Sequence, residues 1–554
     1  MCRNLLLAIA CCVLIAYAQD PAEAVKAPTL GSISGRVVTA GSGAPIPDAE
    51  VAVNRGGPAA ARAVTDAQGH FVLSGLEAGS YRVSALAPDA SGRVGFGPSG
   101  QRTVVLQPGQ NLESFDFKLV VFGTISGKVL DQNKEPVPGV TLFLAVQEYV
   151  SGVPRVVYTN AGGTDDQGEY EVGRVRPGRR YILVAKRLNR QLPPISDAPA
   201  DPAFRRPSFF PTYYPNSKSV DGAETIVIAE GERREGVDIR MIRGASFCLE
   251  GVVDGNPALG PTNFRIAETV PTSGTSGEGG MYTADPGGKA GPDGKIRVCD
   301  LHSGDYELTA SQFSTARNGG MQSFASAVVT ISDRDVQNVR LNSRQRVELS
   351  GEVAIDGPAL DKPVEAKITG DFQALSRTER GTFSSEIPGS FSLKDGLFTD
   401  DFSLTFRGVP SGFYVKDVTY GGRSIHYEPM RLGATMADGG LRVVLARNGG
   451  TVAVKVADKD GNAIPDCSVL LLPASASNEG MLSVAMLTGR TNTQGTWKSA
   501  SVAPGKYYVI ATNDIVDKNI VTMTKIWALR TGAQEVEINP SGNVSITLSP
   551  RGLN

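Results

Sequence analysis

The feature that most constrains the fold of this 554-residue chain is an order of short motifs that recurs along it. The first copy opens with an apolar stretch around Gly35, passes through a proline turn and a Thr-Asp-x-x-Gly segment, and reaches Gly-x-Tyr at Tyr81. The same order returns from residue 125, a weaker copy opens near residue 249, and further copies open near residues 349 and 452; the copy near 349 lacks a clear turn glycine. Such self-similarity indicates several copies of one supersecondary unit rather than one large domain.

Each part of the repeat predicts a strand or a turn. The alternation of Val51 and Val53 is typical of a half-buried strand, and Asp66 followed by Gly69 predicts a tight turn. No segment shows a long, capped helical period, and about seven short strands per copy are the signature of a sandwich. We therefore predict an all-β chain, a tandem array of about five immunoglobulin-like or transthyretin-like β-sandwich modules after a signal peptide. Their predicted ranges are residues 30–120, 122–243, 245–345, 346–446 and 447–550.

In every copy a tyrosine opens an apolar strand shortly after a glycine, two residues later in four copies and three residues later at Tyr181. Its position resembles a tyrosine corner, in which the phenol bonds a nearby backbone group. We expect these rings to be buried and their hydroxyls to bond the backbone of their own module; the alternative is a ligand-binding row along the array. The residues are Tyr81, Tyr181, Tyr306, Tyr414 and Tyr507.

The N-terminus has the layout of an export signal, residues 1–18. Arg3 is followed by an apolar run over residues 5–16 and by a small-x-small site that ends at Ala18. The run is too short to span a bilayer, and cleavage after Ala18 fits better than lipidation at Cys11 or Cys12. No other stretch of the sequence is long and apolar enough to be a transmembrane segment. The chain is therefore predicted to be exported, to the periplasm, the cell surface or the medium.

Cleavage would leave three cysteines in the mature chain. Cys248 and Cys299 fall in one predicted module, where they form either a disulfide or two buried thiols. Cys467 is expected in a core. Cysteines spread this widely form no metal motif.

The motif order resembles the carboxypeptidase regulatory-like domain, clearly over residues 30–120 and 122–243, fairly over 447–550 and weakly elsewhere. The resemblance implies a transthyretin-like, carbohydrate-binding-like β-sandwich related to adhesin B repeats, used as an accessory module without catalytic residues. Adhesin repeats often carry a Lys–Asn isopeptide bond, and Lys455 and Asn543 occupy comparable places. The acidic residue that would template the bond is missing, which favours an exposed lysine and a turn asparagine.

Residues for catalysis or metal binding are sparse. The three histidines, His70, His302 and His426, fall in three different modules, so neither a zinc site nor a Ser-His-Asp arrangement is predicted. No nucleotide-binding loop occurs, and we expect no enzyme activity, cofactor or metal. The 55 basic and 57 acidic residues are interspersed, which argues against a nucleic-acid partner.

One aromatic-rich segment has two interpretations. Its rings, beside arginines, would stack on a sugar or a partner, or they would cover an open edge of their own sandwich. The residues are Phe209, Phe210, Tyr213 and Tyr214. We therefore predict an exported non-catalytic modular protein with a structural, adhesion-like scaffolding or binding role at the cell envelope; the alternative is a carbohydrate-binding protein. Its partners would be polysaccharide or envelope proteins, and a row of exposed aromatics on one sandwich face would favour sugar binding.

Overall fold

The computed structural model describes residues 30–55, 59–88, 94–95, 101–187, 208–254, 261–268, 287–313, 321–344, 346–357, 364–375, 379–433, 435, 437, 440–514 and 516–553. The predicted signal peptide, residues 1–18, lies outside these ranges. Strands dominate the described residues, as the alternating patterns predicted. None of the helices in this part of the chain is long and apolar enough to cross a bilayer.

The sheets fall into five groups along the chain, which we call modules 1 to 5. In module 1, β4 (His70–Leu76), β1 (Gly31–Thr39) and β8 (Asn111–Leu112) form one sheet with β9 (Phe117–Leu119), and β3 (Ala59–Val64), β2 (Glu50–Asn54), β5 (Gly79–Pro88) and β6 (Val94–Gly95) form the other with β7 (Gln101–Leu106). In module 2, β13 (Glu169–Val175), β10 (Gly123–Leu130) and β18 (Arg233–Arg234) join β19 (Ile239–Arg240), opposite β12 (Val153–Gly163), β11 (Thr141–Val150), β14 (Arg180–Lys186) and β16 (Thr212–Tyr213) with β17 (Ile226–Val227). A small extra sheet pairs β15 (Ser208–Phe209) with β20 (Arg243–Gly244).

The remaining modules repeat this plan of two sheets. Module 3 has β24 (Lys295–Leu301), β21 (Phe247–Val252) and β27 (Val336–Arg340) opposite β23 (Gly287–Lys289), β22 (Asn263–Glu268), β25 (Gly304–Phe313), β26 (Met321–Ile331) and β28 (Asn342–Arg344). Module 4 has β32 (Gly389–Phe398), β29 (Arg346–Asp356), β37 (Leu441–Ala446), β34 (Tyr414–Tyr420) and β35 (Arg423–Ser424) opposite β31 (Arg380–Ile387), β30 (Val364–Ala374), β33 (Asp400–Arg407) and β36 (Met430–Leu432). Module 5 has β41 (Thr496–Lys498), β38 (Thr451–Val456) and β44 (Asn543–Leu548) opposite β40 (Leu487–Arg490), β39 (Ser468–Pro473), β42 (Gly505–Thr512) and β43 (Gln534–Ile538).

Each module has the same strand plan and its own hydrophobic core. The opening strand pairs in parallel with the closing strand: β1 with β9, β10 with β19, β21 with β27, β29 with β37 and β38 with β44. The cores lie between the two sheets of each module. The all-β tandem array of β-sandwiches is thus confirmed, and we propose that its modules follow the five ranges predicted from the sequence.

The Ser-Gly of the repeat has a steric reason. A Cβ on Gly35 would lie 2.4 Å from the carbonyl oxygen of Phe115, and one on Gly127 would lie 2.2 Å from that of Val237. A side chain at either position would therefore displace the segment that leads into the closing strand. The carboxylate of Asp116 accepts a hydrogen bond, at 2.8 Å, from the backbone N–H that follows Gly35. The glycine thus permits the parallel pairing of the opening and closing strands in modules 1 and 2.

The predicted tyrosine corners are confirmed in four modules. All five rings are buried, with 2–9% of each residue exposed. Four hydroxyls donate to backbone oxygens of their own module, in the pairs Tyr81–Glu77 (2.9 Å), Tyr181–Arg176 (3.1 Å), Tyr306–His302 (3.1 Å) and Tyr507–Ala503 (2.8 Å). Tyr414 differs, because its hydroxyl donates to the side-chain oxygen of Asn448 at 3.1 Å, in the link to module 5. Burial raises the pKa of Tyr507 to about 12, so this phenol stays protonated.

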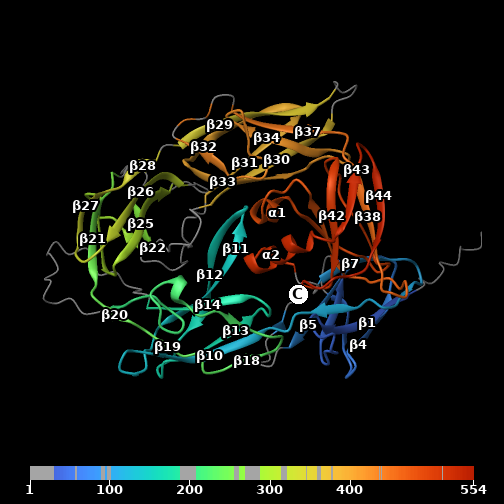
Figure 1. Cartoon of the computed structure of the whole chain (residues 1–554), viewed down its shortest axis with the longest axis horizontal. Coiled ribbons are helices and arrows are strands. Elements are labelled where there is room, and N and C mark those ends of the chain that lie inside the picture. Colours follow the sequence, from blue (N-terminus) through green and yellow to red (C-terminus); the bar gives the residue numbers. More distant parts are fainter. Residues whose placement is uncertain are drawn as a thin grey trace, which may run out of the picture.

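The modules curve into a closed ring (Figure 1). The links are short: β9 ends at Leu119 and β10 begins at Gly123, while β37 ends at Ala446 and β38 begins at Thr451. Module 5 returns to module 1, where Lys118 Nζ donates to Asn513 Oδ1 at 3.2 Å. Two helices, α1 (Glu479–Ala485) and α2 (Ile520–Leu529), lie with β11 inside the ring in Figure 1. The sequence patterns predicted neither the ring nor these helices.

Candidate functional site

The β11–β12 hairpin of module 2 lies inside the ring and joins module 2 to module 5. Its tight turn places Ser151 at φ 52° and Gly152 at φ 83°, the left-handed conformations of a two-residue hairpin turn. The turn reaches α1 of module 5, where a Cβ on Gly480 would lie only 2.2 Å from the carbonyl oxygen of Gly152. Glycine at position 480 thus allows backbone to pack on backbone between modules 2 and 5.

Tyr149 fastens the hairpin to both helices of module 5. Its backbone N–H donates to the carbonyl of Lys518 at 2.9 Å, and its hydroxyl donates to Glu479 Oε2 at 3.0 Å. The same carboxylate oxygen accepts from the hydroxyl of Thr524 at 3.0 Å. Burial and then the bond to Glu479 raise the pKa of Tyr149 to about 12, so the phenol remains a donor.

Arg179 forms the ionic part of this junction. It lies in the turn before β14 and contacts Asp517 at 2.7 Å and Glu148 at 3.2 Å. The side chains of Arg179 and Asp517 are 18% and 12% exposed, so solvent screens this pair less than a surface pair. Asp517 also accepts from the backbone N–H of Asn519 at 3.2 Å, and Asn519 caps α2 through the N–H of Thr522 at 2.8 Å. One arginine thus connects module 2 to the start of α2.

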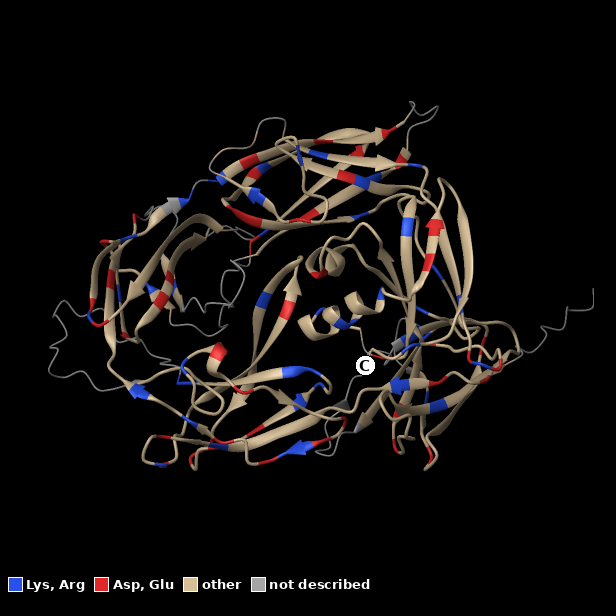
Figure 2. Cartoon of the chain, viewed as in Figure 1, with Lys and Arg blue, Asp and Glu red and all other residues tan. Residues whose placement is uncertain are grey.

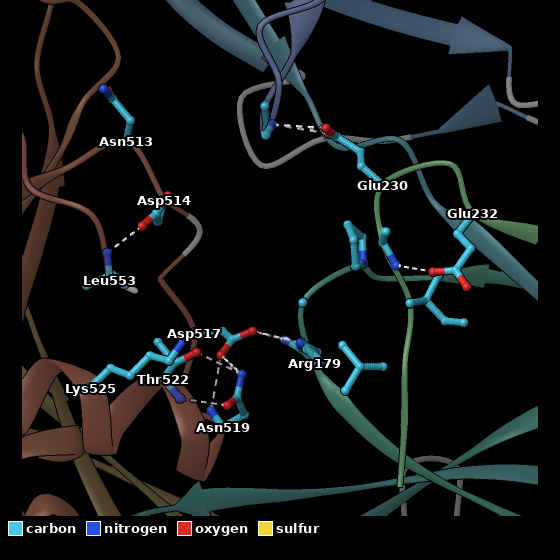
Figure 3. A pocket seen from close by; sticks show the side chains of 17 residues that line it. Arg179, Glu230, Glu232, Asn513, Asp514, Asp517, Asn519, Thr522, Lys525 and Leu553 are labelled. Atoms are coloured by element: carbon cyan, nitrogen blue, oxygen red, sulfur yellow. Dashed lines mark hydrogen bonds and ion pairs between the residues drawn. The ribbon is translucent and has the colours of Figure 1, made fainter.

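A cavity of about 510 Å³ lies where modules 1, 2 and 5 meet (Figure 3). Its walls come from residues 40–41 of module 1, residues 177–179, 227–230 and 232 of module 2, and residues 513, 514, 517, 519, 522, 525 and 553 of module 5. Glu230 connects two of these walls, because its carboxylate accepts from the N–H groups of Gly41 (3.1 Å) and Ser42 (3.3 Å). Junctions between domains are common places for binding pockets.

The carboxylates of this cavity already have partners within the protein. Asp514 accepts from the N–H of Leu553 at 2.5 Å, and Glu232 accepts from the N–H of Ala229 at 2.7 Å. The bond from Ala229, followed by the bond from Arg234, lowers the pKa of Glu232. No cluster of three or more histidine, cysteine or acidic residues able to hold a metal occurs among the described residues. Asp514 and Glu232 thus bond within their own modules, whereas Arg179 and Glu230 bond across modules.

The aromatic segment of module 2 packs inward. Phe209 and Tyr213 are 8% and 2% exposed, and Tyr214 packs against the core of module 2. β16 extends the sheet beside β14, and Phe210 stacks on His302 of module 3 with ring centroids 4.0 Å apart. Phe209 and Tyr213 thus pack inside module 2, and Phe210 lies at the contact with module 3.

His302 joins module 3 to this segment. Its Nε2 lies 2.7 Å from the carbonyl oxygen of Phe209, a residue 93 positions earlier, and the histidine is buried. Burial lowers the pKa of His302, partly offset by the Phe209 carbonyl. His70 and His426 lie in other modules, and His426 stacks on Tyr427 with centroids 4.1 Å apart. The three histidines are therefore not brought together.

The structure also shows where the cysteines Cys248, Cys299 and Cys467 and the pair Lys455 and Asn543 lie. Cys248 and Cys299 are joined by a disulfide between β21 and β24. Cys467 is buried in the core of module 5, and burial raises its pKa to about 11. Lys455 lies opposite Thr547, while Asn543 lies opposite Thr451 and accepts from its hydroxyl at 2.5 Å. Lys455 and Asn543 are four positions out of register.

Residues 32–120 match the sequence profile of the carboxypeptidase regulatory-like domain. Module 1 is therefore similar to the carboxypeptidase regulatory-like domain. The match spans β1 to β9, including Gly35, the Asp66–Gly69 turn and the Tyr81 corner. The carboxypeptidase regulatory-like module thus carries in full the pattern that the later modules repeat less regularly.

Comparison with curated proteins found no match to the chain. Solved structures that align with it include the full-length major pilin of Streptococcus pneumoniae (8% identity, 95% of this chain and 100% of that chain, TM-score 0.19). Two others are the TIE protein of Bacillus anthracis (11%, 91% and 68%, 0.14) and the pilus adhesin of Lactobacillus rhamnosus GG in its open conformation (10%, 76% and 56%, 0.17). Likenesses with TM-scores this low support no inference about arrangement or function, and the match to the carboxypeptidase regulatory-like domain lies within module 1.

Proposed function

We propose that this protein is an exported, non-catalytic scaffold with an adhesion-like role at the cell envelope. The observation that carries the proposal is the set of contacts between modules that are distant in sequence. Arg179 pairs with Asp517, and Tyr149 bonds Glu479. In an enzyme, polar side chains in a cleft point at the substrate. In this protein Arg179 and Tyr149 instead join one module to another, which suits a scaffold that holds its modules in a fixed arrangement.

Export is supported by the sequence of the N-terminus. Residues 1–18 have the charged, apolar and small-x-small order of a secretory signal. A disulfide between Cys248 and Cys299 fits an oxidising compartment outside the cytoplasm. Figure 2 shows acidic and basic residues scattered over all five modules, an arrangement that favours neither nucleic acid nor an anionic surface.

The carbohydrate-binding alternative predicts exposed aromatic platforms. Phe313 is 48% exposed, and no other aromatic residue whose side chain the structure describes is classed as exposed. The other described rings lie in cores or at partly buried junctions. A single exposed ring makes no stacking row, so the described faces favour the scaffold over sugar binding.

Three measurements test this proposal. Mass spectrometry of protein recovered from the envelope should give an N-terminus at Gln19, and protease added to intact cells should reach the chain while a cytoplasmic marker survives. A glycan array probed with the same protein should stay at background. Retention of Met1 in a cytoplasmic fraction would refute export. Specific glycan binding that is lost on changing Phe313 to alanine would instead place the carbohydrate-binding alternative first.

A further inference from the structure

The closing strand of module 5, β44, has a free edge. β44 (Asn543–Leu548) pairs in parallel with β38, and no strand among the described residues pairs with its other side. In Figure 1 this strand lies on the outer rim of the ring, away from the central hairpin. A regular six-residue edge presents unpaired backbone donors and acceptors, which are a template for another strand.

This edge lacks the features that usually protect one. Charged residues and prolines on an edge strand discourage pairing between chains. The other closing strands each carry a cation, namely Lys118 in β9, Arg240 in β19, Arg340 in β27 and Arg442 in β37. β44 reads Asn-Val-Ser-Ile-Thr-Leu and has neither a charge nor a proline. A second strand beside it would meet no like charge.

The core of module 5 is also incompletely covered along β44. Val544, Ile546 and Leu548 face the core but stay partly exposed. In β37 the corresponding Leu441, Val443 and Leu445 are fully buried. In module 4 another strand, β34, pairs antiparallel with β37. Module 4 thus shows that an antiparallel strand fits beside a closing strand, and β44 lacks one.

The backbone groups that point outward can be assigned. The carbonyls of Gly542 and Leu548 accept from β38, from the N–H groups of Thr451 and Ala457, both at 2.9 Å. Residues that alternate along a strand point their backbone groups to the same side. The N–H and C=O groups of Asn543, Ser545 and Thr547 therefore point away from β38.

We propose that two copies of this chain join through β44, antiparallel and in the register that places Ser545 opposite Ser545. Asn543 then faces Thr547 on both sides of the two-fold axis, which gives three facing pairs. Each such pair exchanges two bonds, so about six backbone hydrogen bonds form. The register keeps Val544 and Ile546 of both copies on the core side. The two sheets become one continuous sheet across an isologous interface.

Disulfide trapping tests the register. Hydrogen-bonded antiparallel pairs have Cα atoms about 5.5 Å apart, within disulfide reach. Under mild oxidation, Ser545→Cys should form a covalent dimer in high yield. Ser475→Cys, at an exposed serine of module 5 in the turn after β39 and off the β44 edge, is the matched control and should stay near the wild-type background. Equal cross-linking of the two variants would overturn the proposal.

A charge exchange tests the interface without covalent chemistry. Ser545 is exposed, so Ser545→Lys and Ser545→Glu should melt like the parent at concentrations where the parent is also a monomer. Each variant alone places like charges face to face and should sediment as a monomer at concentrations where the parent is a dimer, a loss of at least tenfold in dimer affinity. An equimolar mixture should dimerise again. A parent that stays monomeric up to about 100 µM, or a monomer that binds an envelope protein at this edge instead, would refute pairing between copies.

Discussion

Replacing Gly480 by alanine should separate the β11–β12 hairpin from α1. The new Cβ would lie 2.2 Å from the carbonyl oxygen of Gly152, where ordinary contact begins at 3.4 Å, so the two segments must part by about 1.2 Å. Both sides of the contact are backbone, so no flexible side chain can turn away.

The expected cost follows from what the movement breaks. The bond from the Tyr149 hydroxyl to the Glu479 carboxylate spans the same contact, and bonds to charged groups contribute about 1.5–3 kcal/mol. Alanine in place of glycine inside a helix stabilises α1 by about 1 kcal/mol. The net loss in the free energy of unfolding should be about 0.5–2 kcal/mol.

Urea denaturation would measure this loss, and hydrogen exchange would localise it to residues 149–153 and 479–485. Gly433→Ala is a matched control, because the nearest atom outside the adjacent residues is 3.9 Å from the place that its new Cβ would take. A Gly480→Ala variant that is more stable than the parent, with unchanged hydrogen exchange at the hairpin, would refute this reasoning. The substitution would then act only through the higher helix propensity of alanine, and the contact between the hairpin and α1 would not stabilise the ring.

Three further predictions concern single modules. Tyr507→Phe should cost module 5 about 0.5–1.5 kcal/mol for one hydrogen bond and Tyr507→Ala on the order of 3–5 kcal/mol because it also leaves a cavity; equal melting of the two variants would contradict this. Burial lowers the pKa of His302 and of His426, so the folded state binds fewer protons than the unfolded state. The contribution of these two residues to the free energy of unfolding is therefore complete above about pH 6.5 and falls as the pH drops through that value. His302→Gln should make the melting temperature fall less steeply between pH 7.5 and pH 5.5. Reduction of the Cys248–Cys299 disulfide should destabilise module 3 by about 2–4 kcal/mol, and thiol labelling of the denatured, unreduced protein should leave both unmodified.

The sequence alone determined the features that depend on neighbours along the chain. A turn such as Asp66–Gly69 closes within five residues, and its carboxylate accepts from the N–H of Gln68 at 2.9 Å. The corner of Tyr81 reaches a carbonyl four residues back. Local contacts of this kind leave a spacing that can be recognised in each copy, and a sandwich buries one face of each such alternating strand.

Only the tertiary structure decided how the modules meet. The partners of Arg179 and Tyr149 in module 5 lie 338 and 330 positions away, and no spacing in the sequence connects them. The side chain of Asn519 caps α2, and that capping residue is visible in the sequence. The ten residues of α2 are a short apolar segment, however, and periodicity alone does not distinguish such a segment from a strand. The ring and its junctions depend on the orientation of each sandwich relative to the next. That orientation is decided by the short links and by the surfaces that pack together. The motif order therefore predicted what each module is, and packing between modules decided the shape they make together.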